Sequence, residues 1–387
     1  MQTFDFLKSI TTVPGTSGNE MAVAEALKDY FAPLCDEAYT DAMGSMVAIQ
    51  RGTGKGPRVM LCAHLDEVSL MTMDVEDDGA IRFMSIGVAS HIMPAQEVLV
   101  LTKEGPKFGV IGAKPPHLLS AEDKKKAYKT DELYIDIGMK PEDVRRLVPA
   151  GTPVQMTGET TLLKNNRAAS KTMDDRACVA IMLRCAEEMK RRAHDADIYY
   201  VATASEETNC LGAITSAYAI DPDMAFVLDV THGSMEGCAP GETCPLDVVP
   251  LSVGPNLHAG LTNFLRERAE KLRMKVYTEV ASGNTYTDAW YVQVSREGVP
   301  CSLMSLPLKY MHTTVETCDL TLIDAQAHLL AETISDINAG WEETLCYSVN
   351  SPPCAAPPVM SMRHARRSAP RPSACSPAAK ARRCTAT

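Results

Sequence analysis

Five short motifs place histidines and carboxylates at or beside the ends of apolar segments. They are His64 and Asp66 in CAHLDE, Asp174 and Asp175 in MDDRA, Glu206 and Glu207 in SEETN, Asp229 in VLDV, and His312 in YMHTT. The carboxyl ends of strands in an open α/β sheet form a ligand crevice, so residues far apart in the sequence can meet there. Imidazole and carboxylate ligands suit Zn, Co or Mn rather than Ca. A bridging carboxylate can hold two such metals about 3.5–4 Å apart, as in two-metal hydrolases.

Each motif alone also fits a structural role. A histidine on an apolar strand is commonly a satisfied core side chain, and Asp-Asp at a helix start commonly caps the helix. Glu206 and Glu207 alone fit a solvated strand end, where neighbouring side chains point to opposite faces. It is the combination of motifs that favours a metal site. For Asp175 we favour a structural role, as a cap or as a partner of Arg176 or of a neighbouring residue.

The surrounding segments predict a mixed α/β domain. Helical periodicity occurs in residues 22–34, 174–192 and 319–337, and near-continuous apolar runs typical of buried strands occur in residues 57–66, 197–205 and 224–230. Ser17 and Glu20 form a pattern like a capping box before the first of these helices. The sequence therefore predicts an open mixed sheet with flanking helices.

Between residues 70 and 163 the pattern changes to short strands with Gly-rich turns and no long helix. Such a pattern is typical of a small β-barrel or sandwich. We interpret it as a domain inserted into the α/β domain, which would then comprise residues 1–69 and 164–347. Residues 348–387 are rich in proline and basic residues, and we predict that they are disordered.

Composition excludes several classes of partner. The net charge of −11 argues against nucleic-acid binding by the folded body. No apolar run approaches the ~20 residues of a membrane span, and the N-terminus lacks the basic region of a signal peptide. The 13 cysteines are scattered without a CxxC pair, which indicates reduced thiols and predicts a cytoplasmic protein.

Taken in chain order, the motifs HLDE, DDR, EE, LDV and YMH resemble the co-catalytic metallo-aminopeptidases of the glutamyl-aminopeptidase and tetrahedral (TET) type, some of which are labelled endoglucanases. The resemblance extends from PGTSGNE (14–20) to YMHTTVE (310–316), and includes IGVASHIM, GVIGAKPPHLL and LYIDIG in the insertion. It implies a zinc-peptidase-like fold with a PDZ-like or barrel-like inserted domain. It also implies that this domain makes dimer contacts and that the protein is a homo-oligomer, from dimer to dodecamer.

The resemblance also implies a ligand set for two divalent metal ions, Zn or Co, with Mn as a further candidate. His64 and Asp229 would complete one metal site, and Glu207 and His312 the other. Asp174 would bridge both metals.

Further roles follow from the same resemblance. Glu206 matches the general base, and Asp66 matches the carboxylate that orients a ligating histidine. His91 and His117 match family positions outside the motifs, and we interpret them as structural or pocket-rim residues. Asp288 would line the wall of the active site.

The function implied is a metal-dependent aminopeptidase. A metal-activated water and the base Glu206 would hydrolyse the N-terminal residue from peptides with a free N-terminus. The chain departs from the usual family pattern at residues that edge the pocket, namely Ser45, Asn209, Tyr286 and Lys309. The preferred N-terminal residue therefore stays open.

Two alternatives also stay open. One is a two-metal deacylase or carboxypeptidase-like hydrolase of N-acyl amino acids, and the other is a non-catalytic oligomeric scaffold. A glycosidase is disfavoured, because such enzymes typically use two carboxylates and would leave His64 and His312 without a role.

Overall fold

An eight-stranded mixed sheet dominates the computed structural model, which describes residues 2–342 of the chain. The strand order is β1-β2-β12-β3-β13-β16-β14-β15. The four parallel strands at the centre are β12 (Asp197–Thr203), β3 (Arg58–His64), β13 (Met224–His232) and β16 (Cys301–Leu308). The flanking strands are β1 (Glu37–Thr40) and β2 (Met46–Gln50) on one side, and β14 (Val249–Val253) and β15 (Val276–Val280) on the other. This open mixed sheet confirms the predicted fold class.

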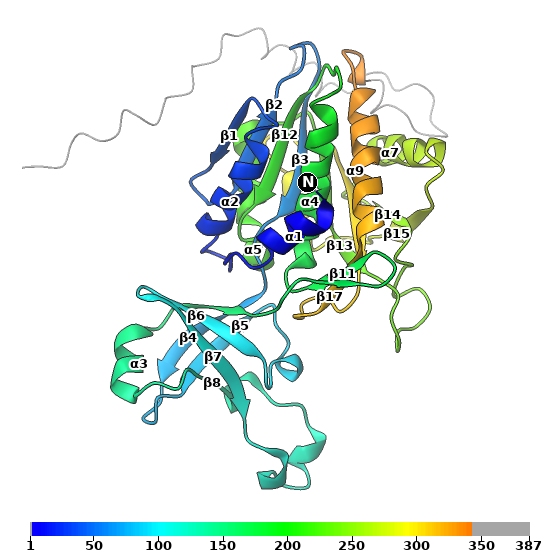
Figure 1. Cartoon of the computed structure of the whole chain (residues 1–387). Helices are drawn as coiled ribbons and strands as arrows, with labels where there is room; N and C mark the ends of the chain where they lie inside the picture. Colours follow the sequence, from blue (N-terminus) through cyan, green and yellow to red (C-terminus); the bar gives the residue numbers. More distant parts are fainter. Residues whose placement is uncertain (1, 343–387) are drawn as a thin grey trace, which may run out of the picture. The chain divides into compact units, whose positions relative to one another are not determined.

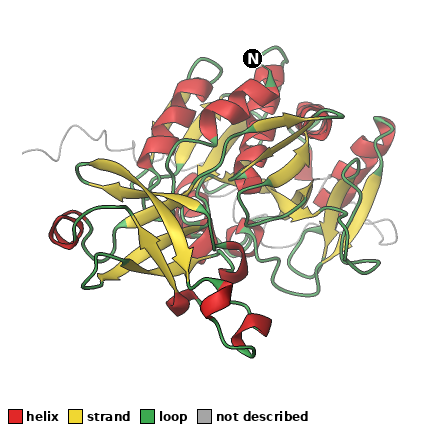
Figure 2. Cartoon of the chain, turned by 60° about the horizontal axis from the view of Figure 1, so that its bottom comes forward, coloured by secondary structure: helices red, strands yellow, loops and turns green. Residues whose placement is uncertain are grey.

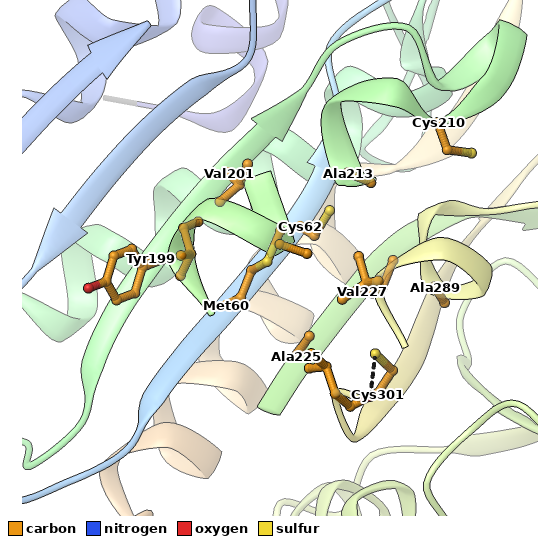
Figure 3. Packing of buried hydrophobic residues seen from close by; sticks show 14 of the residues in the cluster. Met60, Cys62, Tyr199, Val201, Cys210, Ala213, Ala225, Val227, Ala289 and Cys301 are labelled. Atoms are coloured by element: carbon orange, nitrogen blue, oxygen red, sulfur yellow. Dashed lines mark hydrogen bonds between the residues drawn. The ribbon is translucent and has the colours of Figure 1, made fainter. Parts of the chain in front are cut away.

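Helices cover both faces of the sheet. On one face α4 (Met173–Met189) and α9 (Leu320–Ser335) run side by side, with α1 (Thr3–Ile10), α2 (Met21–Phe31) and α7 (Ala259–Lys271) beside them (Figure 1). On the other face α6 (Leu211–Ile220) and α8 (Asp288–Val292) pack over a buried apolar cluster. Figure 3 shows Met60 and Cys62 of β3 in this cluster, with Cys62 close to Ala213 of α6. Because β3 is buried on both faces, its sequence is a continuous apolar run.

A closed barrel follows β3 in the chain. Its strands, in the order β4-β5-β8-β7-β6-β9, are β4 (Ser69–Val75), β5 (Ile81–Ile86), β6 (Glu97–Thr102), β7 (Gly105–Ala113), β8 (Leu133–Asp136) and β9 (Pro153–Met156). In Figure 2 this part of the chain consists of strands with only short helices, one of which is α3 (Pro141–Leu147). Alternate residues of β6 are buried in a separate apolar core, which explains the short alternating segments of the sequence.

A third, three-stranded sheet consists of β10 (Thr161–Leu163), β11 (Arg167–Ser170) and β17 (Glu316–Asp319). β10 lies within the range 70–163 assigned to the insertion but pairs outside the barrel. The exact domain boundaries therefore stay a prediction. The predicted tail, residues 348–387, lies outside the described residues.

Two further observations concern the described residues only. No helix among residues 2–342 is long and apolar enough to cross a bilayer. All nine cysteines in that range are free, as predicted for them.

The predicted capping box before α2 is wrong. Glu20 is the N-cap residue of that helix, but its side chain makes no capping bond. Glu20 Oε1 instead accepts hydrogen bonds from the backbone N–H of Gly18 (2.7 Å) and of Ser205 (3.0 Å). Ser17 Oγ donates to Asp66 Oδ2 at 2.6 Å. Ser17 and Glu20 thus bind Asp66 and Ser205, which lie just after β3 and β12.

Arg176 is fully buried under the first turns of α4. Its Nη1 donates to the backbone oxygens of Ile10 (2.6 Å) and Val13 (2.8 Å), and its Nε to that of Leu65 (3.1 Å). Its Nη2 lies 3.3 Å from Glu67 Oε1. The guanidinium therefore ties α1 and the segment after β3 to α4. Asp175 is not among its partners, which rules out one of the structural roles considered for Asp175.

Replacing Arg176 by methionine is expected to lower the free energy of unfolding by about 3–5 kcal/mol, because two buried carbonyls, one partly buried carbonyl and Glu67 lose a partner. Equilibrium urea unfolding followed by circular dichroism measures the change. Arg191→Met, an exposed substitution just after α4, is the control and should stay within about 0.5 kcal/mol of the parent protein. Equal effects of the two substitutions would contradict the role given to Arg176.

Candidate metal centre

The predicted ligands converge at the carboxyl edge of the central strands. His64 ends β3 and lies opposite Thr203, the last residue of the neighbouring β12. Asp229 lies on β13, the other neighbour of β3. Asp174 comes from the start of α4, and His312 from the segment between β16 and β17. All five motifs therefore meet at one place, as the rule for open α/β sheets predicts.

Asp174 lies between the two histidines. Its Oδ1 is 2.9 Å from His64 Nε2, and its Oδ2 is 3.2 Å from His312 Nε2. His312 Nε2 also lies 3.6 Å from Glu207 Oε1, and His64 Nε2 lies 3.9 Å from Glu206 Oε2. Each oxygen of one carboxylate thus faces a different imidazole, which is the arrangement a bridging ligand needs.

Asp229 and Asp175 lie near His64, the first of the two histidines that Asp174 contacts. Ligand atoms of Asp229, Asp175 and His64 are all within 4.8 Å of one another. Asp175 Oδ2 accepts a hydrogen bond from the backbone N–H of His64 at 3.2 Å, and the residue is fully buried. Asp175 therefore supports the end of β3, in line with the structural role we favoured, although its partner is not Arg176.

The two adjacent glutamates begin a short helix. β12 ends at Thr203, and α5 (Glu206–Asn209) starts after Ser205. Strand alternation therefore does not apply to the pair. Glu206 Oε2 lies towards His64, whereas Glu207 Oε1 lies towards His312.

Asp66 holds both the glutamate pair and His64. Its Oδ1 accepts the backbone N–H of Glu206 (2.9 Å), and its Oδ2 accepts that of Glu207 (3.2 Å). His64 Nδ1 lies 3.2 Å from the backbone oxygen of Asp66 and 3.5 Å from Oδ1. Asp66 thus fixes the turn that carries the glutamates, and its backbone oxygen is the nearer partner of His64 Nδ1. That its carboxylate orients the histidine stays a prediction.

Burial and mutual repulsion shape the electrostatics of the site. Burial raises the pKa of Glu206 to about 10 and that of Asp229 to about 8, and it also raises the pKa of Glu207. Burial opposes ionisation of Asp174 too, but hydrogen bonds with His312 and His64 lower its pKa below the usual range. Such a group of buried carboxylates needs positive charge to be ionised together.

The residues present fit divalent cations. Glu207 Oε1 is buried and accepts no hydrogen bond from residues 2–342, so its lone pairs are available. The pocket that contains it has a volume of about 400 Å³, and its lining includes His64, Asp174, Glu206, Glu207, Asp229 and His312. No lysine or arginine of the described chain lines this pocket. Imidazole nitrogens and carboxylate oxygens without a neighbouring basic side chain form a donor set suited to Zn, Co or Mn.

Other predicted site residues lie elsewhere. His91 and His117 are exposed and do not line the pocket. Asp288 does not form the pocket wall, where its neighbour Thr287 lies instead. The Asp288 carboxylate is buried and accepts hydrogen bonds from Thr203 Oγ1 (2.5 Å) and Cys62 Sγ (3.2 Å). It lies beside Glu206 and Cys210, all three having ligand atoms within 4.8 Å.

Glu316 was missed by the sequence analysis. Its Oε2 accepts the backbone N–H of Asp174 (3.0 Å), and its Oε1 accepts that of His312 (2.7 Å). The side chain is buried, and burial raises its pKa. One carboxylate therefore holds the backbones of two predicted ligands. Its position at the end of YMHTTVE was a signal, but the sequence did not show which backbone it would bind.

Glu316→Gln is expected to weaken metal binding by about 10- to 100-fold, because the amide nitrogen cannot accept one of the two backbone N–H groups. Isothermal titration of the chelator-treated protein with Zn or Co measures the effect. Glu104→Gln, which removes an exposed carboxylate of the barrel that pairs with Arg146, is the control. Unchanged affinity in Glu316→Gln would exclude the positioning role.

Comparison with known proteins gives the family. The sequence model of the M42 glutamyl aminopeptidase family matches residues 44–329, more than half of the chain. The chain belongs to the M42 family of peptidases. As an M42 peptidase it is a peptide hydrolase of the aminopeptidase type.

Relatives and solved structures agree with this assignment. The M42 peptidase is 32% identical over 331 residues to a lysyl aminopeptidase of Pyrococcus furiosus, covering 84% of this chain and 94% of the relative. Its fold is similar to that of a TET aminopeptidase from a Thaumarchaeota archaeon, with a TM-score of 0.83, 28% identity, and coverage of 89% and 98% of the two chains. The Pyrococcus horikoshii TET1 peptidase, described as assembling into a tetrahedron or a large octahedral shell, has a TM-score of 0.75 at 25% identity, with coverage of 87% and 100%.

Proposed function

We propose that this M42 peptidase is a two-metal aminopeptidase that removes the N-terminal residue from peptides with a free α-amine. The observation that supports two metals is the Asp174 carboxylate, whose two oxygens face different histidines. In this proposal Asp174 would be shared by the two metals, His64 and Asp229 would hold one of them, and Glu207 and His312 would hold the other.

Glu206 is the general base of the proposal. Bound divalent cations would supply Lewis acidity for the scissile carbonyl, a lowered pKa for an attacking water, and a field that favours ionised Glu206. Glu206 would take a proton from the water and later deliver it to the leaving amine. Its carboxylate lies in the pocket, beside His64 and next to Glu207, so it is within reach of a substrate carbonyl held there.

The same acidic pocket accounts for aminopeptidase specificity. A protonated α-amine would be attracted by the carboxylates around Glu206 and Glu207, whereas an N-acyl group carries no charge. Binding of the amine fixes the first peptide bond at the reacting centre, so cleavage is restricted to the N-terminal residue.

The test is a substrate panel after removal of metal by a chelator and reconstitution with Zn, Co or Mn. We expect hydrolysis of aminoacyl-p-nitroanilides and none of the N-acetylated counterparts. Cleavage of N-acetyl amino acids alone would favour the deacylase alternative. No hydrolysis with any of the three metals would favour the scaffold.

We also propose a homo-oligomer, from dimer to dodecamer, located in the cytoplasm. The barrel exposes large apolar side chains that a contact between copies could cover, namely Met73, Met84, Phe108 and Val110. The free cysteines suit a reducing compartment. Light scattering after size-exclusion chromatography tests the assembly, and a monomer would contradict it.

A further inference from the structure

The pocket extends from the candidate metal ligands to the edge strand of the sheet. Glu279 of β15 lines the pocket together with residues of the two intervening strands, Ser252 of β14 and Ser305 of β16. Ser305 pairs directly with Asp229, the candidate ligand on β13. Since neighbouring strands lie about 4.8 Å apart, a side chain in contact with Ser305 is roughly one to two strand spacings from Asp229.

Only hydroxyl groups satisfy the Glu279 carboxylate among the described residues. Ser252 Oγ (2.8 Å) and Ser305 Oγ (3.3 Å) donate to its Oε2, and Thr231 Oγ1 donates to its Oε1. An ionised carboxylate offers about four acceptor positions, so one position stays open on Oε1. Hydroxyl donors bring no net charge, and the described residues that line the pocket include no lysine or arginine. The negative charge of Glu279 is therefore available to a ligand.

The path between Glu279 and the metal ligands is partly apolar. Val230, Val280, Leu303 and Met311 line the same pocket. Lysine and arginine combine an aliphatic stem with a charged head, and they commonly bury the stem along apolar surface. The apolar wall of this pocket suits the aliphatic stem of such a side chain, and the Glu279 carboxylate, away from the reacting centre, suits its positively charged head.

We propose that Glu279 makes this pocket select peptides whose N-terminal residue is lysine or arginine. The inference rests on the proposed aminopeptidase function and specifies its substrate class. The positively charged head pairs with Glu279 Oε1, and the stem lies along the apolar wall. An N-terminal glutamate or aspartate would place its carboxylate against Glu279, so such substrates are disfavoured. An N-terminal leucine fits the apolar wall but gives Glu279 no partner.

The test compares kcat/KM for the p-nitroanilides of lysine, arginine, leucine and glutamate, using the metal-loaded full-length protein. We expect lysine and arginine to exceed leucine, and glutamate to be the poorest. Glu279→Gln keeps the shape but removes the charge, and it should lower the lysine-to-leucine ratio of kcat/KM by about 10- to 100-fold. The activity on lysine should fall by more than the activity on leucine, because only lysine forms an ion pair with Glu279.

Glu37→Gln is the matched control. Glu37 lies on β1, at the opposite edge of the same sheet, where its carboxylate is exposed and pairs with Arg51. This control changes the net charge equally and should leave the lysine-to-leucine ratio at the parent value. A second readout needs no variant, because added NaCl should lower the parent protein's preference for lysine by screening the ion pair.

Two results would overturn the inference while leaving the aminopeptidase function intact. One is a parent enzyme that cleaves the leucine substrate as well as the lysine substrate. The other is a lysine-to-leucine ratio that is the same in Glu279→Gln and Glu37→Gln. Absence of cleavage of every substrate by the metal-loaded protein would overturn the proposed function and this inference with it.

Discussion

Replacing Glu206 by glutamine is expected to lower kcat by about 100- to 10,000-fold and to leave the metal content unchanged. Glutamine has the size of glutamate but cannot accept the proton of the attacking water. The backbone of the turn is held by Asp66 and is not altered by the substitution. Glu206 Oε2 lies 3.9 Å from His64, whereas Glu207 and Asp174 approach the histidines more closely. The loss should therefore concern the reaction rather than metal binding.

Initial rates on an aminoacyl-p-nitroanilide and elemental analysis of the same samples separate the two effects. Thr208→Ala is the matched control, because Thr208 is an exposed residue on the same short helix. That control should retain both metal and activity. A Glu206→Gln enzyme that works near the parent rate would remove Glu206 from the role of base. Loss of metal along with the rate would instead place Glu206 among the ligands.

Asp174→Ala is expected to abolish stable binding of both metals and all activity. The two oxygens of the carboxylate lie 2.9 Å from His64 Nε2 and 3.2 Å from His312 Nε2, so its removal affects both sites at once. Elemental analysis after dialysis should give close to no metal per chain, compared with two for the parent protein.

The control for this substitution is Asp5→Ala, which removes an exposed carboxylate from α1. Circular dichroism should show that both variants are folded. If the Asp174→Ala protein retained one metal per chain, the carboxylate would belong to one site only. Retention of two metals would show that it is not a ligand.

The positions of the candidate ligands could be predicted because they depend on a general property of the fold. His64 and Asp229 lie on adjacent parallel strands whose apolar sequences were recognisable, and such strands end at one edge of a sheet. The resemblance to a family then supplied roles that no spacing could give. The change from long apolar runs to short alternating strands likewise indicated the barrel.

The side chains that hold the site together could not be predicted in the same way. Glu316, Glu20 and Arg176 bind backbone groups of segments that are distant in the sequence. A buried side chain that satisfies a distant backbone group leaves no periodic pattern, and its partner is known only when the fold is known. Strand β10 raises the same difficulty, since its three residues do not show whether they join the barrel or pair with β11.

The location of Glu279 on an edge strand has a consequence for how substrate choice can change in descendants of this protein. Among the strands that the structure describes, β15 has one neighbour, whereas the strands that bear His64 and Asp229 each have two. Substitutions on β15 therefore disturb fewer packed neighbours, and they leave the strands of the metal ligands in place. Preference for one N-terminal residue over another can thus diverge between gene copies through changes at a peripheral position, while selection preserves the hydrolytic centre.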